Sequence, residues 1–432
     1  MKKWVAMMLS AIMVLPLPGC SVGETSQGVT TLAVVEYPED EQEEAQEALE
    51  EMQKEMEYVD AHEDELKGFF EKSTMSLLDS VKEENAVCSP LNVYMALSML
   101  AETTDGDSRE QILELLGMEE IQDLRELTKA VWEQNYSNND SICILANSLW
   151  LDTETAYKKE TVDLLAENYY ASSFQGKMGS EEYNQELQGW VNQQTGGLLE
   201  ENAADLAFSP ETIMELVSTV YLRAKWGHEF EKENTKEDIF HAENGDMTCE
   251  FMNQETDTYY YWGDKFGALK LSLLGNNGLS MWFVLPDEGV APEQLTEEGQ
   301  LMEVLLNGWD RSDKKYLTVN LSVPKFDVAS SADLKESLHA LGVADVFDMN
   351  LSDFTPLTED SKIYLSEVAH SARVAIDEEG VTAAAYTAEI GDGADMPPEE
   401  EMDFVIDRPF LFAITNRNNL PLFVGIVKNP LG

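Results

Sequence analysis

Apolar and polar positions follow a helical spacing in the first half of the chain and form short strand-like runs in the second. Residues 66–78, 92–100, 109–116 and 157–170 have the apolar spacing that predicts helices. After residue 214, apolar runs alternate with turns that contain glycine or proline, and these runs predict strands. They span residues 215–222, 259–262, 268–274, 279–285, 318–326, 363–367, 373–376, 410–415 and 422–427. Helices early and strands late indicate an α+β chain with large mixed or antiparallel sheets.

Length and charge narrow the class of protein. The chain has 432 residues, of which 43% are hydrophobic, which is enough for one large domain or two ordinary ones. Its formal net charge is −55, so its long-range field repels nucleic acid, heparin-like polyanions and anionic membrane surfaces. We therefore expect none of these as a direct partner, whereas basic proteins stay open as partners.

The first twenty residues resemble a bacterial lipoprotein signal peptide. Two lysines follow Met1, an apolar run extends from Trp4 to Leu17, and Gly19 precedes Cys20. The run is too short to span a bilayer comfortably. Cleavage before Cys20 would leave this residue at the new N-terminus as the lipidated anchor. An ordinary secretory signal with a chance cysteine is the alternative. Either signal places the mature chain outside the cytoplasm, lipid-anchored to a bacterial membrane or cell surface, or secreted.

An acidic stretch separates this signal from the more apolar part of the chain. Residues 36–65 hold fifteen aspartates and glutamates but one lysine, Lys54. Apolar residues recur within the stretch at helical spacing, which predicts a solvated acidic helix. We expect residues 21–65 to form a spacer, partly helical or disordered, that holds a globular domain of residues 66–432 away from the membrane. A solvated charge run without a role is the alternative.

The cysteines and histidines show no arrangement typical of a metal site or a catalytic centre. Besides Cys20 the chain has Cys88, Cys143 and Cys249, an odd number in apolar surroundings, and no CxxC motif. We interpret these three as buried thiols rather than as disulfide partners or metal ligands. GxSxG, HExxH, Walker A and GxGxxG motifs are absent from any suitable context, and the five histidines form no constellation. We therefore expect no enzyme, no metal and no cofactor.

One stretch near the C-terminus is rich in small residues. It follows the predicted strand 373–376 and ends before Pro397 and Pro398. As a strand, it would turn Val381 and every second residue after it toward a core, with no charge on that face before Glu389. Its residues are Glu378, Glu379, Gly380, Val381, Thr382, Ala383, Ala384, Ala385, Tyr386 and Thr387.

This stretch resembles the hinge of the reactive-centre loop of an inhibitory serpin, and further motifs agree with that family in order across residues 66–432. The resemblance implies a serpin fold with a large central mixed sheet, two further sheets and helices clustered in the N-terminal half. It also implies a monomer with an exposed reactive-centre loop at about residues 378–403. In serpins a cleaved loop of this kind inserts into a sheet as an added strand.

Two groups of residues match positions where this family controls the opening of its central sheet. Trp226 resembles the breach tryptophan at the top of that sheet, and Lys325 resembles the lysine that pairs with the hinge glutamate, here Glu378. As an exposed ion pair, these two would contribute about 0 to 1 kcal/mol. The shutter beneath the sheet corresponds to Ser89, Pro90, Asn92, Ser218 and His370. Because the residues at 92 and 218 depart from the family pattern, we expect rearranged shutter hydrogen bonds, with Asn92 supplying the amide.

The family spacing from Glu378 places the scissile bond between Ala394 and Asp395. A small residue there suits the shallow pocket of an elastase-like serine protease, whereas cleavage after Asp392 or Met396 stays open. The resemblance implies an irreversible suicide-substrate inhibitor that traps the acyl-enzyme when the loop inserts. The alternatives are a non-inhibitory serpin that acts as a binding or surface protein, and a sacrificial substrate that is cleaved without trapping.

Overall fold

The computed structural model describes residues 25–26, 28–35, 37–38, 45–81, 84–138, 141–275, 278–297, 299–307, 314–360, 362–381, 398 and 400–432. The expected hinge residues from Thr382 to Thr387, the expected scissile pair Ala394 and Asp395, and Cys20 lie outside these ranges. Within them, no helix is both long enough and apolar enough to cross a membrane.

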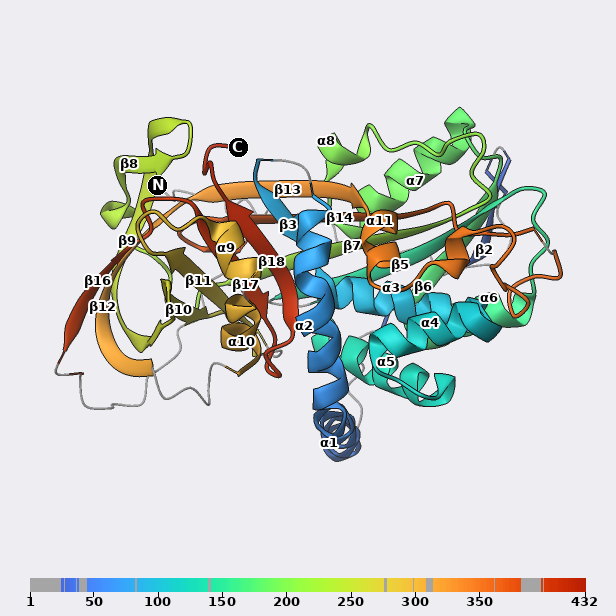
Figure 1. Cartoon of the computed structure of the whole chain (residues 1–432), viewed down its shortest axis with the longest axis horizontal. Helices are drawn as coiled ribbons and strands as arrows, with labels where there is room; N and C mark the ends of the chain where they lie inside the picture. The colour runs from blue at the N-terminus through green and yellow to red at the C-terminus, as the bar shows by residue number, and fades with distance from the viewer. Residues whose placement is uncertain are drawn as a thin grey trace, which may run out of the picture.

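A large mixed sheet, here called sheet A, runs through the molecule (Figure 1). Most neighbouring strands are antiparallel, but β5 pairs parallel with β6, and β7 pairs parallel with β14. The mixed central sheet expected from the sequence is therefore present. In spatial order its strands are β1 (Thr25–Ser26), β2 (Val29–Ala33), β6 (Ala171–Gly176), β5 (Ile142–Asp152), β7 (Met214–Lys225), β15 (Gly380–Val381), β14 (Glu367–Ile376) and β13 (Phe326–Asp333), and β4 (Ser137–Asn138) also pairs with β5.

The remaining strands form a second sheet system at the other end of the molecule (Figure 1). The long strand β9 pairs with β8, β10 and β12, which makes the two further sheets expected from the sequence continuous with each other. In order the strands are β16 (Glu401–Val405), β12 (Lys314–Pro324), β9 (Gly245–Trp262), β10 (Phe266–Ser272), β11 (Ser280–Pro286), β17 (Phe410–Thr415), β18 (Pro421–Val427) and β3 (Ala86–Cys88), with β8 (Lys236–Ala242) beside β9.

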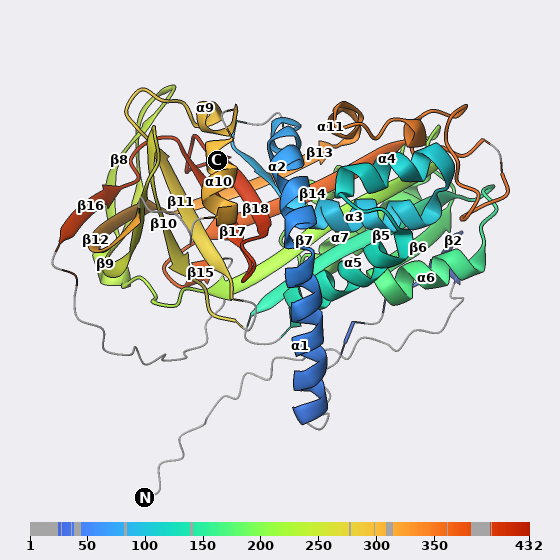
Figure 2. The same ribbon diagram turned by 60° about the horizontal axis from the view of Figure 1, so that its bottom comes forward.

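Helices cover both faces of sheet A (Figures 1 and 2). One face packs on α3 to α6 and the main hydrophobic core, and the other packs on α7 through a smaller cluster around Trp150 and Tyr183. Most of the longer helices precede residue 200, as expected. The helices are α1 (Ala45–Ala61), α2 (Glu63–Asp79), α3 (Pro90–Thr103), α4 (Gly106–Leu116), α5 (Ile121–Asn135), α6 (Lys159–Tyr169), α7 (Glu181–Gln194), α8 (Glu200–Ala203), α9 (Pro292–Glu297), α10 (Gln300–Asn307) and α11 (Lys335–Ala340).

Part of the expected acidic spacer packs against the domain. Strand β2 extends sheet A by pairing antiparallel with β6, and Tyr37 stacks on Trp132 with ring centroids 5.7 Å apart. The helix predicted in the acidic run is present as α1, and its residue Val59 is buried in the main core. Packing against the domain thus starts near residue 29, before the boundary expected at residue 66.

The structure corrects two of the predicted strands. The range 318–326 belongs to two strands in different sheets, because β12 ends at Pro324, which has no N–H for a ladder, and β13 begins at Phe326. The ranges 363–367 and 373–376 were predicted as separate strands. Residues 363–366 lie in no strand, and a single strand of sheet A, β14, runs unbroken from Glu367 to Ile376. Residues 369–372, between the two predicted ranges, pair with β13 and so continue the strand.

Candidate functional site: the opening of sheet A

The start of the hinge already lies within sheet A. Strand β15 pairs antiparallel with both neighbours, placing Val381 between Ile376 of β14 and Ala224 of β7. Below this point β7 and β14 pair directly with each other, from Glu215 opposite Glu367 up to Thr219 opposite Ser371. Sheet A is therefore parted at its top by two residues of the loop and closed at its foot.

Gly380 is required by the close approach of the β7 backbone. A Cβ atom at this position would lie 2.2 Å from the carbonyl oxygen of Ala224 and 2.7 Å from the Cα of Lys225. Real Cβ atoms do not approach backbone atoms so closely, so a larger residue would force β15 outward. The hinge glycine thus allows the loop to begin its path between the strands.

A tight turn and Trp226 hold the residues just before β15. The Asp377 carboxylate accepts hydrogen bonds from the N–H groups of Glu379 and Gly380, at 2.8 and 3.1 Å. The buried indole of Trp226 donates to the Asp377 carbonyl oxygen at 2.8 Å, and its backbone N–H donates to the Glu379 carbonyl oxygen at 3.2 Å. Trp226, named from the sequence as the breach residue, therefore contacts the hinge directly.

Glu378 forms a buried ion pair with Lys325. Its side chain is 8% exposed, and its Oε1 lies 2.8 Å from the Lys325 Nζ and accepts from the Thr235 hydroxyl at 2.7 Å. Burial acts to raise the pKa of Glu378, but hydrogen bonds from Lys325 and Thr235 outweigh burial and hold this pKa below its ordinary value. The pair is thus not the exposed one assumed from the sequence. Loss of Lys325 would leave the buried Glu378 charge poorly compensated, whereas Lys325 would keep its contact with Glu250 if Glu378 were lost.

A hydrogen-bond network centred on Asn92 lies under the middle of sheet A. The Asn92 Nδ2 donates to the Ser218 hydroxyl and to the Thr219 carbonyl oxygen, each at 2.8 Å, and to the Ala146 carbonyl oxygen at 3.3 Å. The Asn92 Oδ1 accepts from the Asn147 amide at 3.0 Å. Asn92 is fully buried, so it supplies an amide that links α3 to β5 and β7.

His370 joins the same network from β14. The Ser89 N–H donates to its Nε2 at 2.9 Å, so the proton of the neutral ring lies on Nδ1, which faces the Ser218 hydroxyl at 3.2 Å. Burial lowers the pKa of His370 to about 4, which keeps the ring neutral near pH 7. Ser89 also caps α3 ahead of Pro90, with its hydroxyl accepting from the Asn92 N–H. The structure thus brings all five residues named for the shutter together.

Several residues that complete these sites are not marked by any motif in the sequence. Lys232 pairs with Glu379 at 2.7 Å, and Glu250 contacts Lys325 at 3.1 Å. Thr235 and Asn147 complete the hinge and shutter networks described above. No local motif marks these residues, because each becomes a neighbour only through strand pairing across long stretches of chain.

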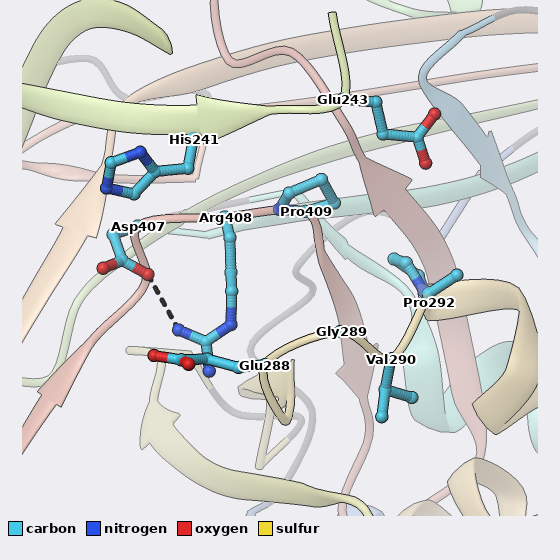
Figure 3. A pocket seen from close by; sticks show the side chains of 10 residues that line it. His241, Glu243, Glu288, Gly289, Val290, Pro292, Asp407, Arg408 and Pro409 are labelled. Carbon is cyan, nitrogen blue, oxygen red and sulfur yellow. Dashed lines mark hydrogen bonds and ion pairs between the residues drawn. The ribbon is translucent and has the colours of Figure 1, made fainter. Parts of the chain in front are cut away.

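A polar pocket of about 450 Å³ lies elsewhere in the molecule (Figure 3). Its walls come from the end of β8, the connection between β11 and α9, and the segment after β16, including Asp407 and Arg408. The Arg408 guanidinium is engaged by Asp407 at 2.8 Å and by the Pro286 carbonyl oxygen. None of the described hinge, breach or shutter residues lines this pocket.

The described cysteine thiols show no sign of reactivity. Cys88, Cys143 and Cys249 are free and buried, and burial raises the pKa of each thiol. They are therefore protonated, unreactive thiols near pH 7.

Replacing Gly380 with alanine is expected to displace β15. The added methyl group meets backbone atoms of Ala224 and Lys225, so the pairing of Gly380 and Val381 with β7 is lost, at about 1 to 3 kcal/mol of native stability. Thermal unfolding of the uncleaved chain measures this loss. Gly68→Ala in α2 is the matched control, because no atom lies within 4 Å of its added Cβ, and alanine favours the helix. An equal or higher melting temperature for Gly380→Ala would contradict this account of the hinge.

Comparison with known proteins agrees with this arrangement. The family model described as "Serpin (serine protease inhibitor)" matches residues 69–430. The leukocyte elastase inhibitor of Sus scrofa is 30% identical over 365 residues, covering 82% of this chain and 96% of that protein. A serine protease inhibitor of Cyanea capillata is 27% identical, covering 82% of this chain and 95% of that protein. The chain therefore belongs to the serpin family, whose members are mostly protease inhibitors rather than enzymes, although some are non-inhibitory.

The solved structures show the same fold. The native crystal structure of the thermophilic serpin tengpin matches with a TM-score of 0.73 and 26% sequence identity, covering 84% of this chain and 94% of tengpin. The serpin fold expected from the hinge motif is confirmed.

Proposed function

We propose that the chain is an irreversible suicide-substrate inhibitor of serine proteases with elastase-like specificity. The observation that carries this proposal is the position of β15 between β7 and β14, with the same two strands paired directly below it. The loop thus begins as an inserted strand. To insert further, a cleaved loop would have to separate the parallel strands β7 and β14.

The pairing register of β15 extends this path residue by residue. Val381 faces the main core, so in a continued antiparallel strand Ala383, Ala385 and Thr387 would face the core as well. None of these side chains is charged or bulky. Tyr386 would face the α7 side. The eight residues from Val381 to Ala388 therefore meet no obstruction by charge on the core side.

Insertion supplies the energy that a trap needs. About thirteen residues, 381–393, at ~3.3 Å each would carry an attached protease roughly 40 Å along sheet A. Hydrogen bonds at ~1 kcal/mol each would total on the order of 10 kcal/mol, which rivals the stability of a whole domain. Displacing one oxyanion-hole donor slows deacylation by ~10²- to 10³-fold. A distorted protease would therefore remain as the acyl-enzyme.

The same register predicts that Glu389 opposes insertion of the loop. Eight residues below Val381, it would face the core between Leu216 and Val368, both of which are buried. An ionised carboxylate there carries a large desolvation penalty. We predict that Glu389→Leu raises the melting temperature of the loop-cleaved chain by several degrees relative to cleaved wild type. Glu399→Leu, beyond the inserted segment, serves as control, and no difference between the two variants would contradict the extended register.

The target class is inferred from the loop sequence. Ala394 before Asp395 suits a protease with a small primary pocket, and one relative is named a leukocyte elastase inhibitor. We further propose that the chain acts outside the cytoplasm as a monomer, with Cys20 as a lipid anchor. Radiolabelled fatty acid on the full chain, lost in Cys20→Ala, tests the anchor.

Incubation of the soluble chain with elastase-, chymotrypsin- and trypsin-like proteases tests the function. We expect a covalent complex with the elastase-like enzyme that survives boiling in SDS. The mass of the released C-terminal peptide should match a peptide that begins at Asp395. Cleavage without a complex would favour a sacrificial substrate. Absence of both cleavage and complex with every protease would favour a non-inhibitory binding protein. An unchanged melting temperature after cleavage would refute insertion.

A further inference from the structure

Three carboxylates lie side by side at the foot of sheet A, on the face covered by α7. Glu215 of β7 is directly opposite Glu367 of β14 in the parallel pairing, and Asp333 of β13 is opposite Ala369, two residues along β14. Val217 and Ala369 belong to the hydrophobic cluster under α7, and alternation along each strand puts Glu215, Glu367 and Asp333 on that same face. Glu215 is only 5% exposed, so water does not screen it well.

Like charges directly opposite each other destabilise a strand pair. The Asp333 carboxylate accepts hydrogen bonds from the N–H groups of Val368 and Lys335, at 3.2 and 3.0 Å. Glu215 is buried, Glu367 is half-buried and Asp333 is exposed, so a negative charge on Glu215 would be repelled by both neighbours with little screening by water. A carboxylic acid facing a carboxylate can instead donate a short, strong hydrogen bond across the two strands.

We propose that Glu215 and Glu367 form a pH-dependent latch between the strands that the loop must separate. While the two carboxyl groups share a proton, the foot of sheet A stays closed, and loss of that proton loosens it. The importance of the latch for trapping rests on the proposed function, but its effect on the closed sheet does not.

The register places this latch on the path of the loop. Nine residues below Val381 in the continued strand is Ile390, and nine residues along β14 and β7 from its two partners are Glu367 and Glu215. Ile390 would therefore lie between the two carboxyl groups. An added strand moves β7 and β14 from about 4.8 Å to about 9.6 Å apart, which breaks the shared hydrogen bond.

The surrounding groups favour protonation near neutral pH. Burial, followed by the charges of Glu367 and Asp333, raises the pKa of Glu215 to about 8. Burial and Asp333 also raise the pKa of Glu367, whereas Lys335 of α11 opposes that rise. On the α7 side Tyr183 lies within electrostatic reach of Glu215, and also of Asp152 of β5 and Glu186 of α7. The two glutamates titrate as a coupled pair.

The direction of the pH effect follows from these groups. A carboxyl group with a raised pKa is protonated in the closed sheet but ionised in any state where the two groups separate. The closed sheet therefore loses stability relative to such states as the pH rises through about 8. We expect the pairing of β7 with β14 at the foot of sheet A to be more stable at pH 6.5 and to open more readily at pH 8.5.

Uptake of a synthetic peptide with the sequence of residues 380–391 by the intact chain measures opening without any protease. We expect uptake about tenfold faster at pH 8.5 than at pH 6.5 for wild type, since one proton is released. Glu215→Gln, a neutral mimic of the protonated latch, should take up the peptide at a slow, pH-independent rate, and Glu367→Gln should behave in the same way. Glu211→Gln, an exposed carboxyl group four residues earlier, should retain the wild-type profile.

Thermal unfolding provides the second measurement. The melting temperature of wild type should fall by about 3 °C more than that of Glu215→Gln between pH 6.5 and 8.5. Equal profiles for wild type and Glu215→Gln in both measurements would overturn the latch and leave the proposed function intact. If no peptide enters at any pH, the proposed insertion fails and the melting profiles alone decide the latch.

Discussion

If the chain traps proteases as proposed, Ala385→Glu is expected to convert it from an inhibitor into a substrate. In an inserted strand that continues the register of β15, residue 385 would lie four positions below Val381 and would face the main core between β14 and β7. A glutamate there would have to lose its charge or stay outside, and burying an unpaired carboxylate opposes insertion by several kcal/mol. We expect the SDS-stable complex to fall at least 100-fold while cleavage of the loop continues at the wild-type rate.

The matched control lies one residue away. Ala384→Glu places the same charge on the α7 side of the inserted strand, where alternation turns the side chain away from the core. It should retain most of the trapping, within about threefold of wild type. Electrophoresis of both variants after incubation with an elastase-like protease gives the ratio of complex to cleaved chain. Equal losses for the two variants would show that the loop does not follow the register of β15.

The start of the hinge, from Glu378 to Val381, and the order of elements could be predicted because their signals are local. The small-residue run after β14 and the glycine at 380 are visible in the sequence, and the apolar runs that became β7, β17 and β18 are short and bounded by turns. The spacing of apolar residues in a buried strand or an amphipathic helix indicates which of its faces is buried. The same holds for Ser89 and Pro90, which mark the start of α3 through capping chemistry.

The other features of the fold and the site depend on pairing between segments far apart in the sequence, which no local pattern reveals. Strand β2 has the polar centre Thr30-Thr31, so nothing in its own sequence shows that it extends sheet A beside β6. The opposition of Glu215 and Glu367 arises from a parallel register between segments about 150 residues apart. Glu378 looked like a surface residue because the sequence cannot show that Thr235 and Lys325 enclose it.

Asn92→Asp is expected to destabilise the closed sheet by about 3 to 5 kcal/mol. The Asn92 Nδ2 donates to two carbonyl oxygens and the Ser218 hydroxyl, and an aspartate would present a carboxylate oxygen to all three. Two of these contacts then become repulsive, and the buried charge has no cation in the network of Asn147, Ser218 and His370. Melting of the uncleaved chain at pH 7 measures the loss. Asn168→Asp in α6, whose amide donates to one helix carbonyl, should cost less than about 1 kcal/mol.

The pH dependence of the Asn92→Asp variant separates this electrostatic account from simple misfolding. A buried carboxyl group has a raised pKa, so the variant aspartate should regain a proton, and with it one donor toward Ser218 or a carbonyl oxygen, as the pH falls. Its deficit relative to wild type should therefore shrink steadily from pH 8 to pH 5.5, while the small deficit of Asn168→Asp stays constant. In wild type His370 remains neutral over this range because burial lowers its pKa to about 4, so the wild-type reference does not change through this ring. A deficit that stays the same at every pH would mean that shape, rather than the lost donors and the added charge, makes Asn92 necessary.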